Sequence, residues 1–229
     1  MALVREFCAE NREHVPAAIA AGAARIELCD NLTVGGTSPS YGVIRAVVDY
    51  VRAHDAAVMA MCRPRGGDFV YSEVERDMML DDVRCARSLG VTGVVFGCLR
   101  PDEEGRLALD EAMVRQLVDA AKGAGTGLAA GADPVCVTFH MAFDALDGER
   151  QLAAIDVLAE LGVERILTHG GEAGTPIEQN FGRLSELIDY AQGRLTIMPG
   201  GGITWENAEA VADVLGVSEV HGTKIVRLA

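Results

Sequence analysis

The 229-residue chain has no closely spaced cysteine pair, no long hydrophobic run and few basic residues. None of its six cysteines forms a C-x-x-C motif, which argues against a structural zinc site and leaves buried, reduced thiols as the default expectation. No stretch approaches the roughly 18 apolar residues of a membrane-spanning helix. The first residues, MALVREFCAENREH, carry charge too early for a signal peptide, so we expect a cytoplasmic protein.

The shortage of positive charge limits the possible partners. With 20 basic and 34 acidic side chains, the formal net charge is −14. The resulting negative field disfavours binding to nucleic acid and to anionic membrane surfaces. Any anionic ligand therefore needs a local cationic site.

Short apolar runs alternate with helix-like segments along the chain. Helix starts are predicted near Asn11, at the Ser72/Glu75 capping box and near Thr204, and a loose stretch occupies 123–134. The predicted strands are 3–8, 24–29, 56–62, 91–97, 135–140, 164–169, 195–200 and 218–222.

Strict alternation of strand and helix predicts a parallel sheet, and eight strands close a TIM-type (β/α)₈ barrel. We therefore predict one barrel domain over 1–229, with the eighth helix short or missing because only TKIVRLA follows the last strand. A doubly wound open sheet is the alternative. The glycine-rich turn that such a sheet has after its first strand is absent, because CAEN follows the first strand here.

Polar residues collect where the predicted strands end, at the face where such barrels bind ligands. Glu27 and His140 are a candidate acid–base pair. Arg63 in MCRPRGGDF (61–69) is a candidate clamp for a carboxylate or phosphate, and Asp68 is a further candidate catalytic group. The alternative is that the arginines only organise the loop through an ion pair with Asp68 or Glu27.

Two of the cysteines form a candidate metal site. Strand parity places Cys8 and Cys29 on the inner face of neighbouring strands, together with Glu27. Two soft thiolates suit Cu(I), but the same thiols could equally be packed core residues.

Glycine clusters follow two other strands and suggest anion binding. Backbone amides at Gly200, Gly201 and Gly202, at Gly170 and Gly171, and the Arg65 guanidinium could hold a phosphate or carboxylate. The glycines could instead only permit tight turns. His169 and His221 also stand at strand ends, where a histidine is often only structural.

Several segments together resemble the CutC family. They are ARIELC with NLTVGGTSPSYG (24–42), MCRPRGGDF (61–69), GVVFG (93–97), VTFHMAFD (137–144), RILTHGG (165–171), IMPGGGIT (197–204) and EVHG (219–222). The resemblance spans almost the whole chain, and RPRGGDF with MPGGGI is its most specific part. It implies a TIM-type barrel, a cytoplasmic location, a role in copper homeostasis with copper binding, and a homo-oligomer such as a dimer or tetramer. The chain departs from the family at Met141, where arginine is usual, and at His169, where serine is usual.

Three functions stay open from the sequence. The first is copper homeostasis with Cu(I) bound at Cys8 and Cys29. The second is an enzyme, of lyase or isomerase type, acting on a small phosphorylated or carboxylated metabolite at the barrel mouth. The third is a scaffold whose oligomer surface is its function.

Overall fold

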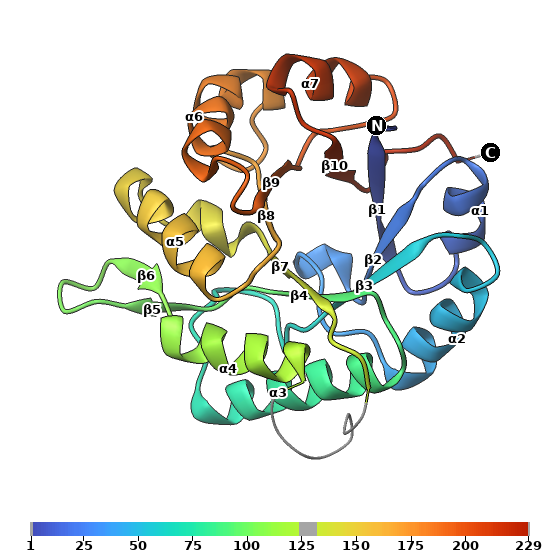
Figure 1. Cartoon of the computed structure of the whole chain (residues 1–229), viewed down its shortest axis with the longest axis horizontal. Coiled ribbons are helices and arrows are strands. Elements are labelled where there is room, and N and C mark those ends of the chain that lie inside the picture. Colours follow the sequence, from blue (N-terminus) through green and yellow to red (C-terminus); the bar gives the residue numbers. More distant parts are fainter. Residues whose placement is uncertain (1, 124–131, 229) are drawn as a thin grey trace.

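The computed structural model describes residues 2–123 and 132–228 and confirms the predicted barrel (Figure 1). Residues 124–131 of the loose stretch at 123–134 lie outside the described part. The barrel strands are β1 (Val4–Glu10), β2 (Arg25–Cys29), β3 (Ala57–Met61), β4 (Gly93–Phe96), β7 (Cys136–Phe139), β8 (Arg165–Thr168), β9 (Thr196–Pro199) and β10 (Glu219–Gly222).

All eight barrel strands run parallel, in the order β10-β1-β2-β3-β4-β7-β8-β9. The first and last strands of this order, β10 and β9, lie next to each other, so the sheet curves into a nearly closed barrel (Figure 1). Because all strands are parallel, their carboxyl ends meet at one rim. The site residues predicted from the sequence stand at or just after these carboxyl ends.

Helices surround the barrel on its outside (Figure 1). They are α1 (Val15–Ala20), α2 (Tyr41–Val51), α3 (Glu73–Ser88), α4 (Glu111–Lys122), α5 (Gly148–Glu160), α6 (Phe181–Ala191) and α7 (Ala208–Leu215), with short 3-10 turns η1 (Leu32–Val34), η2 (Met141–Ala145) and η3 (Ile177–Asn180). No helix follows β10 in the described residues up to 228, as predicted. Among the helices described, none is long and apolar enough to cross a membrane.

The helix starts agree only in part with the sequence patterns. The capping box of Ser72 and Glu75 is present at the start of α3, where each side chain accepts a hydrogen bond from the other residue's backbone amide. The predictions for Asn11 and Thr204 are wrong. Asn11 adopts a left-handed conformation ahead of α1, and Thr204 donates its amide to Asn207, so that α7 starts only at Ala208.

A two-stranded hairpin was not predicted. β5 (Leu99–Pro101) and β6 (Leu107–Leu109) pair antiparallel and project from the barrel between β4 and α4 (Figure 1). Each strand has only three residues, too few for a clear alternation pattern.

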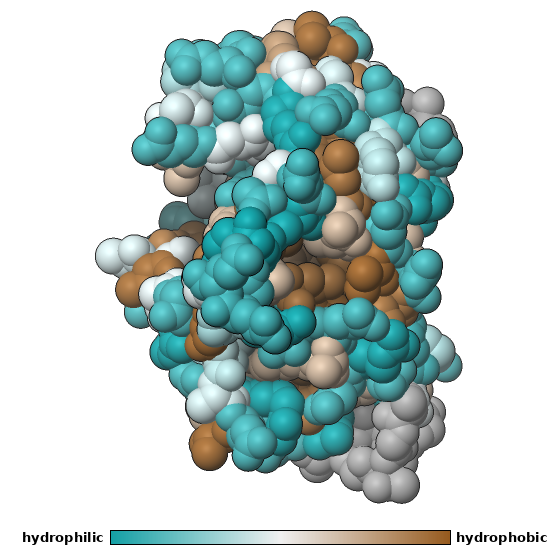
Figure 2. Space-filling model, turned by 90° about the vertical axis from the view of Figure 1, so that its left-hand side faces the viewer, coloured by the Kyte–Doolittle hydropathy of each residue, from teal (hydrophilic) through white to brown (hydrophobic). Residues whose placement is uncertain are grey.

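Two packed layers hold the fold together. A large apolar core lies between the strands and the surrounding helices, and a small one inside the barrel consists of Cys8, Cys29, Met59, Met61 and Val95. Hydrophilic residues cover most of the outer side shown in Figure 2, around a central band of hydrophobic ones.

The barrel interior near the amino-terminal ends of the strands is charged. Arg25 pairs there with Glu6 and Glu219, and Arg165 also pairs with Glu219. Glu6 and Arg25 are both buried. Pairing of this kind offsets the cost of burying charged groups. The network closes the bottom of the barrel and leaves the rim as the open end.

Candidate functional site

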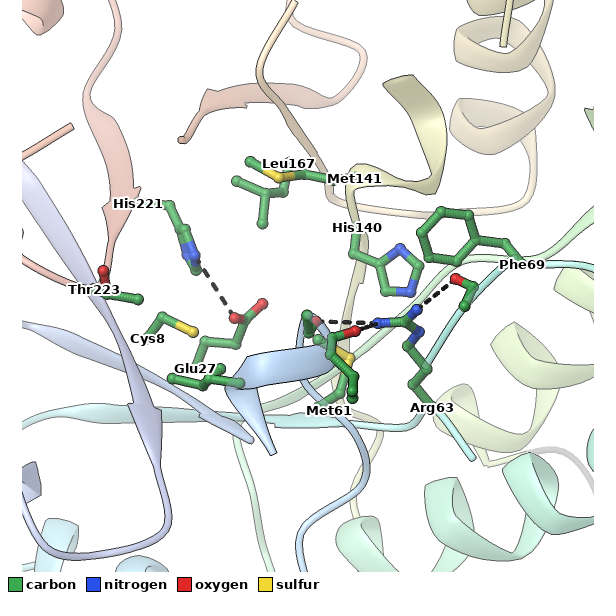
Figure 3. Close-up of a pocket in the computed structure, with 14 residues that line it drawn as sticks. Cys8, Glu27, Met61, Arg63, Phe69, His140, Met141, Leu167, His221 and Thr223 are labelled. Carbon is green, nitrogen blue, oxygen red and sulfur yellow. Dashed lines mark hydrogen bonds and ion pairs between the residues drawn. The ribbon is translucent and has the colours of Figure 1, made fainter. Parts of the chain in front are cut away.

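A cavity of about 440 Å³ opens at the carboxyl-terminal rim of the barrel. Four of the predicted site residues, Cys8, Glu27, Arg63 and His140, line it together with apolar side chains (Figure 3). The expectation that residues far apart in the sequence meet at one rim is therefore confirmed. Their chemical roles stay predictions.

One of the two predicted thiols, Cys8, lines this cavity. Cys29 does not line it and is fully buried at the end of β2, where its Sγ donates to Glu27 Oε2 at 3.6 Å. The sequence suggested that Cys8 and Cys29 are direct strand neighbours, and the register corrects this. Cys8 stands opposite Glu27, and Cys29 stands opposite Glu10. The thiols nevertheless belong to one sulfur-rich cluster with Met59 and Met61.

A histidine from the last strand completes this side of the cavity. Ligand atoms of Cys8, Glu27 and His221 all lie within 4.8 Å of one another, and all three residues are buried. His221 Nε2 lies 3.6 Å from Glu27 Oε2, and Nδ1 lies 2.8 Å from Glu6 Oε1. Glu27 Oε1 is buried and has no hydrogen-bond partner in the described structure. This arrangement joins one sulfur, one nitrogen and one unsatisfied oxygen.

The electrostatics of this group disfavour additional negative charge. Burial raises the pKa of Glu27. Contact with Cys29, burial and the Glu27 charge raise the pKa of the Cys8 thiol. Burial opposes a charge on His221, but the Glu27 carboxylate and hydrogen bonds to Cys8 and Glu6 outweigh it and raise the pKa of His221. Negative charge is thus costly here unless a proton or another cation offsets it.

Arg63 lies on the opposite side of the cavity (Figure 3). Its Nη1 donates to the carbonyls of Val34, Gly35 and Gly36 at 3.1 Å each, and Nη2 donates to Gly67 O at 2.9 Å. Its guanidinium carbon lies 4.8 Å from the centre of the Phe69 ring. Arg63 does not form the alternative ion pair with Asp68 or Glu27, whereas Arg65 does pair with Asp68. The Arg63 side chain instead joins two loops while keeping its charge at the cavity.

His140 lies beside Arg63, directly after β7. Its Nδ1 accepts a hydrogen bond from Ala142 N at 3.1 Å, and its Nε2 is buried without a partner in the described structure. Burial and the Arg63 charge lower the pKa of His140 to about 3, so the ring is neutral at physiological pH. No hydrogen bond joins the described Glu27 and His140 side chains, which lie across the cavity from each other (Figure 3).

Asp68 and Arg65 lie outside the cavity lining. They form an ion pair of 3.0 Å, and Arg65 Nε also donates to Glu75 Oε1 at 2.5 Å. Arg65 further donates to Val70 O at 2.8 Å. The two residues thus hold the loop before α3, and their catalytic and anion-binding roles stay predictions.

The predicted glycine cradles are also packed against neighbours. A Cβ at Gly200 would lie 2.6 Å from Leu167, and one at Gly201 would lie 2.8 Å from His169. Equivalent atoms at Gly170 and Gly171 would lie 2.7 Å from Leu184 and 2.3 Å from Asn180. Gly202 has more space but adopts φ +76°, which favours glycine. Close packing and turn geometry account for these residues, and anion binding there stays a prediction.

Met141 and His169, the two residues that differ from the usual CutC pattern, lie in different surroundings. Met141 lines the cavity with its thioether side chain. His169 does not line the cavity. Its Nδ1 contacts Gly200 O and its Nε2 contacts Thr175 Oγ1, each at 3.1 Å. His169 therefore fixes two loops.

The sequence alone does not identify His221 and Met61 as site residues. Both line the cavity beside Cys8. The parity of EVHG would have placed His221 and Glu219 on one face, but only barrel closure shows that this face meets Glu6 and Glu27.

Comparisons with known proteins agree with these features. The model of the CutC family matches residues 3–226. A CutC family protein of Enterococcus faecalis is 53% identical over 224 residues, which cover 98% of this chain and 100% of that protein. The mouse copper homeostasis protein cutC homolog is 38% identical, over 94% of this chain and 71% of its own.

Solved structures give the same result. A CutC structure from Streptococcus agalactiae has a TM-score of 0.88 at 39% identity and covers 98% of this chain and 100% of its own. The aldolase QR15 has a TM-score of 0.68 at 11% identity, over 97% and 91% of the two chains, and this shows a shared fold alone. The alternative of a lyase or isomerase gains no support from such a likeness. The family match over nearly all residues and the close relatives establish that this chain belongs to the CutC family.

Proposed function

We propose that this protein binds Cu(I) at the rim of its barrel as part of copper homeostasis, with Cys8 and Cys29 as the main ligands. The observation that carries the proposal is the sulfur cluster of Cys8, Cys29 and Met61, of which Cys8 and Met61 face the cavity. Soft thiolate and thioether ligands select Cu(I) over harder cations. The names of the mouse and human relatives, copper homeostasis protein cutC homolog, support the same metal.

The donor set fits a monovalent soft cation. Glu27 Oε1 is buried without a partner beside Cys8 and His221, and such an atom is costly unless a cation or donor satisfies it. A bound metal ion requires the thiolate form, so binding releases protons. The positive charge of Cu(I) then offsets the negative charge that the thiolates add next to Glu27.

Access to the site is consistent with binding from solution. Cys8 lines the open cavity, whereas Cys29 lies behind it with Gly36 close to its sulfur. A Cβ at Gly36 would lie 3.1 Å from Cys29 Sγ, and the residue has φ +85°. Glycine thus lets the 35–36 loop pack directly on the thiol and keeps it out of bulk water.

An anaerobic Cu(I) titration against a competing chelator such as bicinchoninate tests the proposal. We expect one tightly bound equivalent in the native protein and loss of this equivalent in the Cys8→Ser, Cys29→Ser double variant. Unchanged stoichiometry and affinity in that variant would overturn the proposal.

Cys62→Ser is the matched control. Cys62 is buried to a similar extent, but it belongs to the core between strands and helices and donates to Ala60 O. Serine can make the same hydrogen bond, so we expect native Cu(I) binding in this variant. If Cys62→Ser also lost Cu(I) binding, the loss in the double variant would reflect a disturbed fold rather than the removal of metal ligands.

The cellular setting forms part of the proposal. All six cysteines are free, and the reducing cytoplasm would keep Cys8 and Cys29 available for metal. Assembly into a homo-oligomer stays a prediction, which light scattering on the purified protein would test.

A further inference from the structure

The side of the cavity opposite the thiols carries an unbalanced positive charge. Arg63 is 4% exposed, and no carboxylate among the described residues pairs with it. Its partners are four neutral backbone carbonyls and the face of Phe69. Buried charges are normally paired with an opposite charge. Of the two arginines in MCRPRGGDF, Arg65 meets this rule through Glu75 and Asp68, and Arg63 does not.

The same wall carries two unused hydrogen-bond donors. Nδ1 of His140 accepts from Ala142 N, so the neutral ring holds its proton on Nε2. That nitrogen is buried and has no partner in the described structure, and the same is true of Arg63 Nε. A buried donor without a partner destabilises the protein, and a ligand that accepts from it removes this cost.

Phe69 brings the two side chains together. Its ring centre lies 4.8 Å from the Arg63 guanidinium carbon and 5.1 Å from the His140 ring centre. Figure 3 shows His140 directly beside Arg63, with Phe69 next to both. The geometry thus concentrates one cation and one neutral donor within a small area of the cavity wall.

The rest of this region is apolar. Met61, Met141 and Leu167 line the cavity between the Arg63 side and the His221 side (Figure 3). A site of this kind favours a ligand with a single negative group and an apolar body. It disfavours a phosphate dianion, because Arg63 is the one arginine or lysine among the described residues that line the cavity, while His221 on the other side is already paired with Glu6 and Glu27.

We propose that the Arg63 and His140 wall of the cavity binds the carboxylate of a small, largely apolar organic acid. The carboxylate accepts from these donors, and the apolar body packs against Met61, Met141 and Leu167. The proposal concerns the side of the cavity away from Cys8 and does not depend on copper binding.

Benzoate and its uncharged analogue benzamide test the proposal on the native protein. We expect benzoate to bind about tenfold more tightly than benzamide, the difference that a charge-assisted hydrogen bond makes. Benzoate should also shift the NMR signals of the His140 ring. Equal binding of the two compounds, or shifts confined to residues outside the cavity, would overturn the proposal and leave water as the partner of these donors. Tighter binding of inorganic phosphate than of benzoate would contradict the carboxylate assignment.

Variants of the two neighbouring arginines provide the second test. Arg63→Met should remove the preference for benzoate over benzamide, while Arg65→Met should retain it, because Arg65 does not line the cavity. Arg63→Lys keeps the charge in case Arg63→Met fails to fold, and it should retain part of the preference. The Cys8→Ser, Cys29→Ser double variant should bind benzoate normally, so a failed copper site and a failed carboxylate site are distinguishable.

Discussion

His221 Nδ1 lies 2.8 Å from Glu6 Oε1, and this contact joins the last barrel strand to the first. The two residues stand directly opposite each other in the parallel register of β10 and β1. Glu6 also receives the guanidinium of Arg25, so one buried carboxylate connects three neighbouring strands. Hydrogen bonds to His221 and the charge of Arg25 outweigh burial and lower the pKa of Glu6 to about 2.

This network predicts a large cost for Arg25→Met. The substitution leaves the Glu6 and Glu219 carboxylates short of positive charge in the barrel interior. Removing one partner of a buried pair typically costs about 3–5 kcal/mol. Urea unfolding should show a loss of this size. Arg115→Met, which removes an exposed i,i+4 pair with Glu111, should cost at most ~1 kcal/mol, and similar losses in the two variants would contradict the network's importance.

Gly97→Ala tests the packing of His140. An added Cβ would lie 2.6 Å from the His140 ring and 2.8 Å from Ala142 Cβ, so the ring must move. Overpacking of this kind costs about 1–3 kcal/mol. The matched control is Gly182→Ala in α6, where no atom lies within 4 Å and the better helix former should stabilise by up to ~1 kcal/mol. A stabilising effect of Gly97→Ala would show that the ring is not held as described.

His140 also gives the folded protein a pH dependence. Its folded pKa of about 3 lies below the ~6.5 of a free imidazole, so the unfolded chain binds the extra proton between these values. The stability that neutral His140 contributes is complete above about pH 6.5 and is lost as the pH falls toward 3. The slope is at most ~1.4 kcal/mol per pH unit.

The measurement compares the free energy of unfolding of the native protein and of His140→Asn between neutral pH and pH 4. Asparagine keeps an acceptor for the Ala142 amide, which His140 satisfies in the native protein. We expect a flatter pH dependence in the variant. Parallel curves would mean that His140 titrates as a solvated histidine.

The barrel could be predicted because its strands follow a strong local pattern. Every predicted barrel strand lies within one or two residues of an observed one at each end, since apolar runs and turn residues mark them clearly. The start of α7 could not be predicted in this way. Thr204 is a good capping residue, but the contact of Asn207 with its amide and the bridge from Thr204 to Lys224 hold the segment outside the helix.

The site could be predicted only to the level of strand parity. Parity placed Glu27, Cys8 and Cys29 inside the barrel, and the structure agrees. It could not give the register, which sets Glu27 rather than Cys29 opposite Cys8. It could not distinguish Arg63 from Arg65 either, because their different partners come from the folding of the 32–36 and 66–75 loops around them.

Anomalous diffraction from crystals loaded anaerobically with Cu(I) tests the central claim most directly. The account predicts one strong copper peak between the sulfur atoms of Cys8 and Cys29, close to Glu27 and His221. A copper peak elsewhere on the chain, with Cys8 and Cys29 still packed as described above, would contradict it.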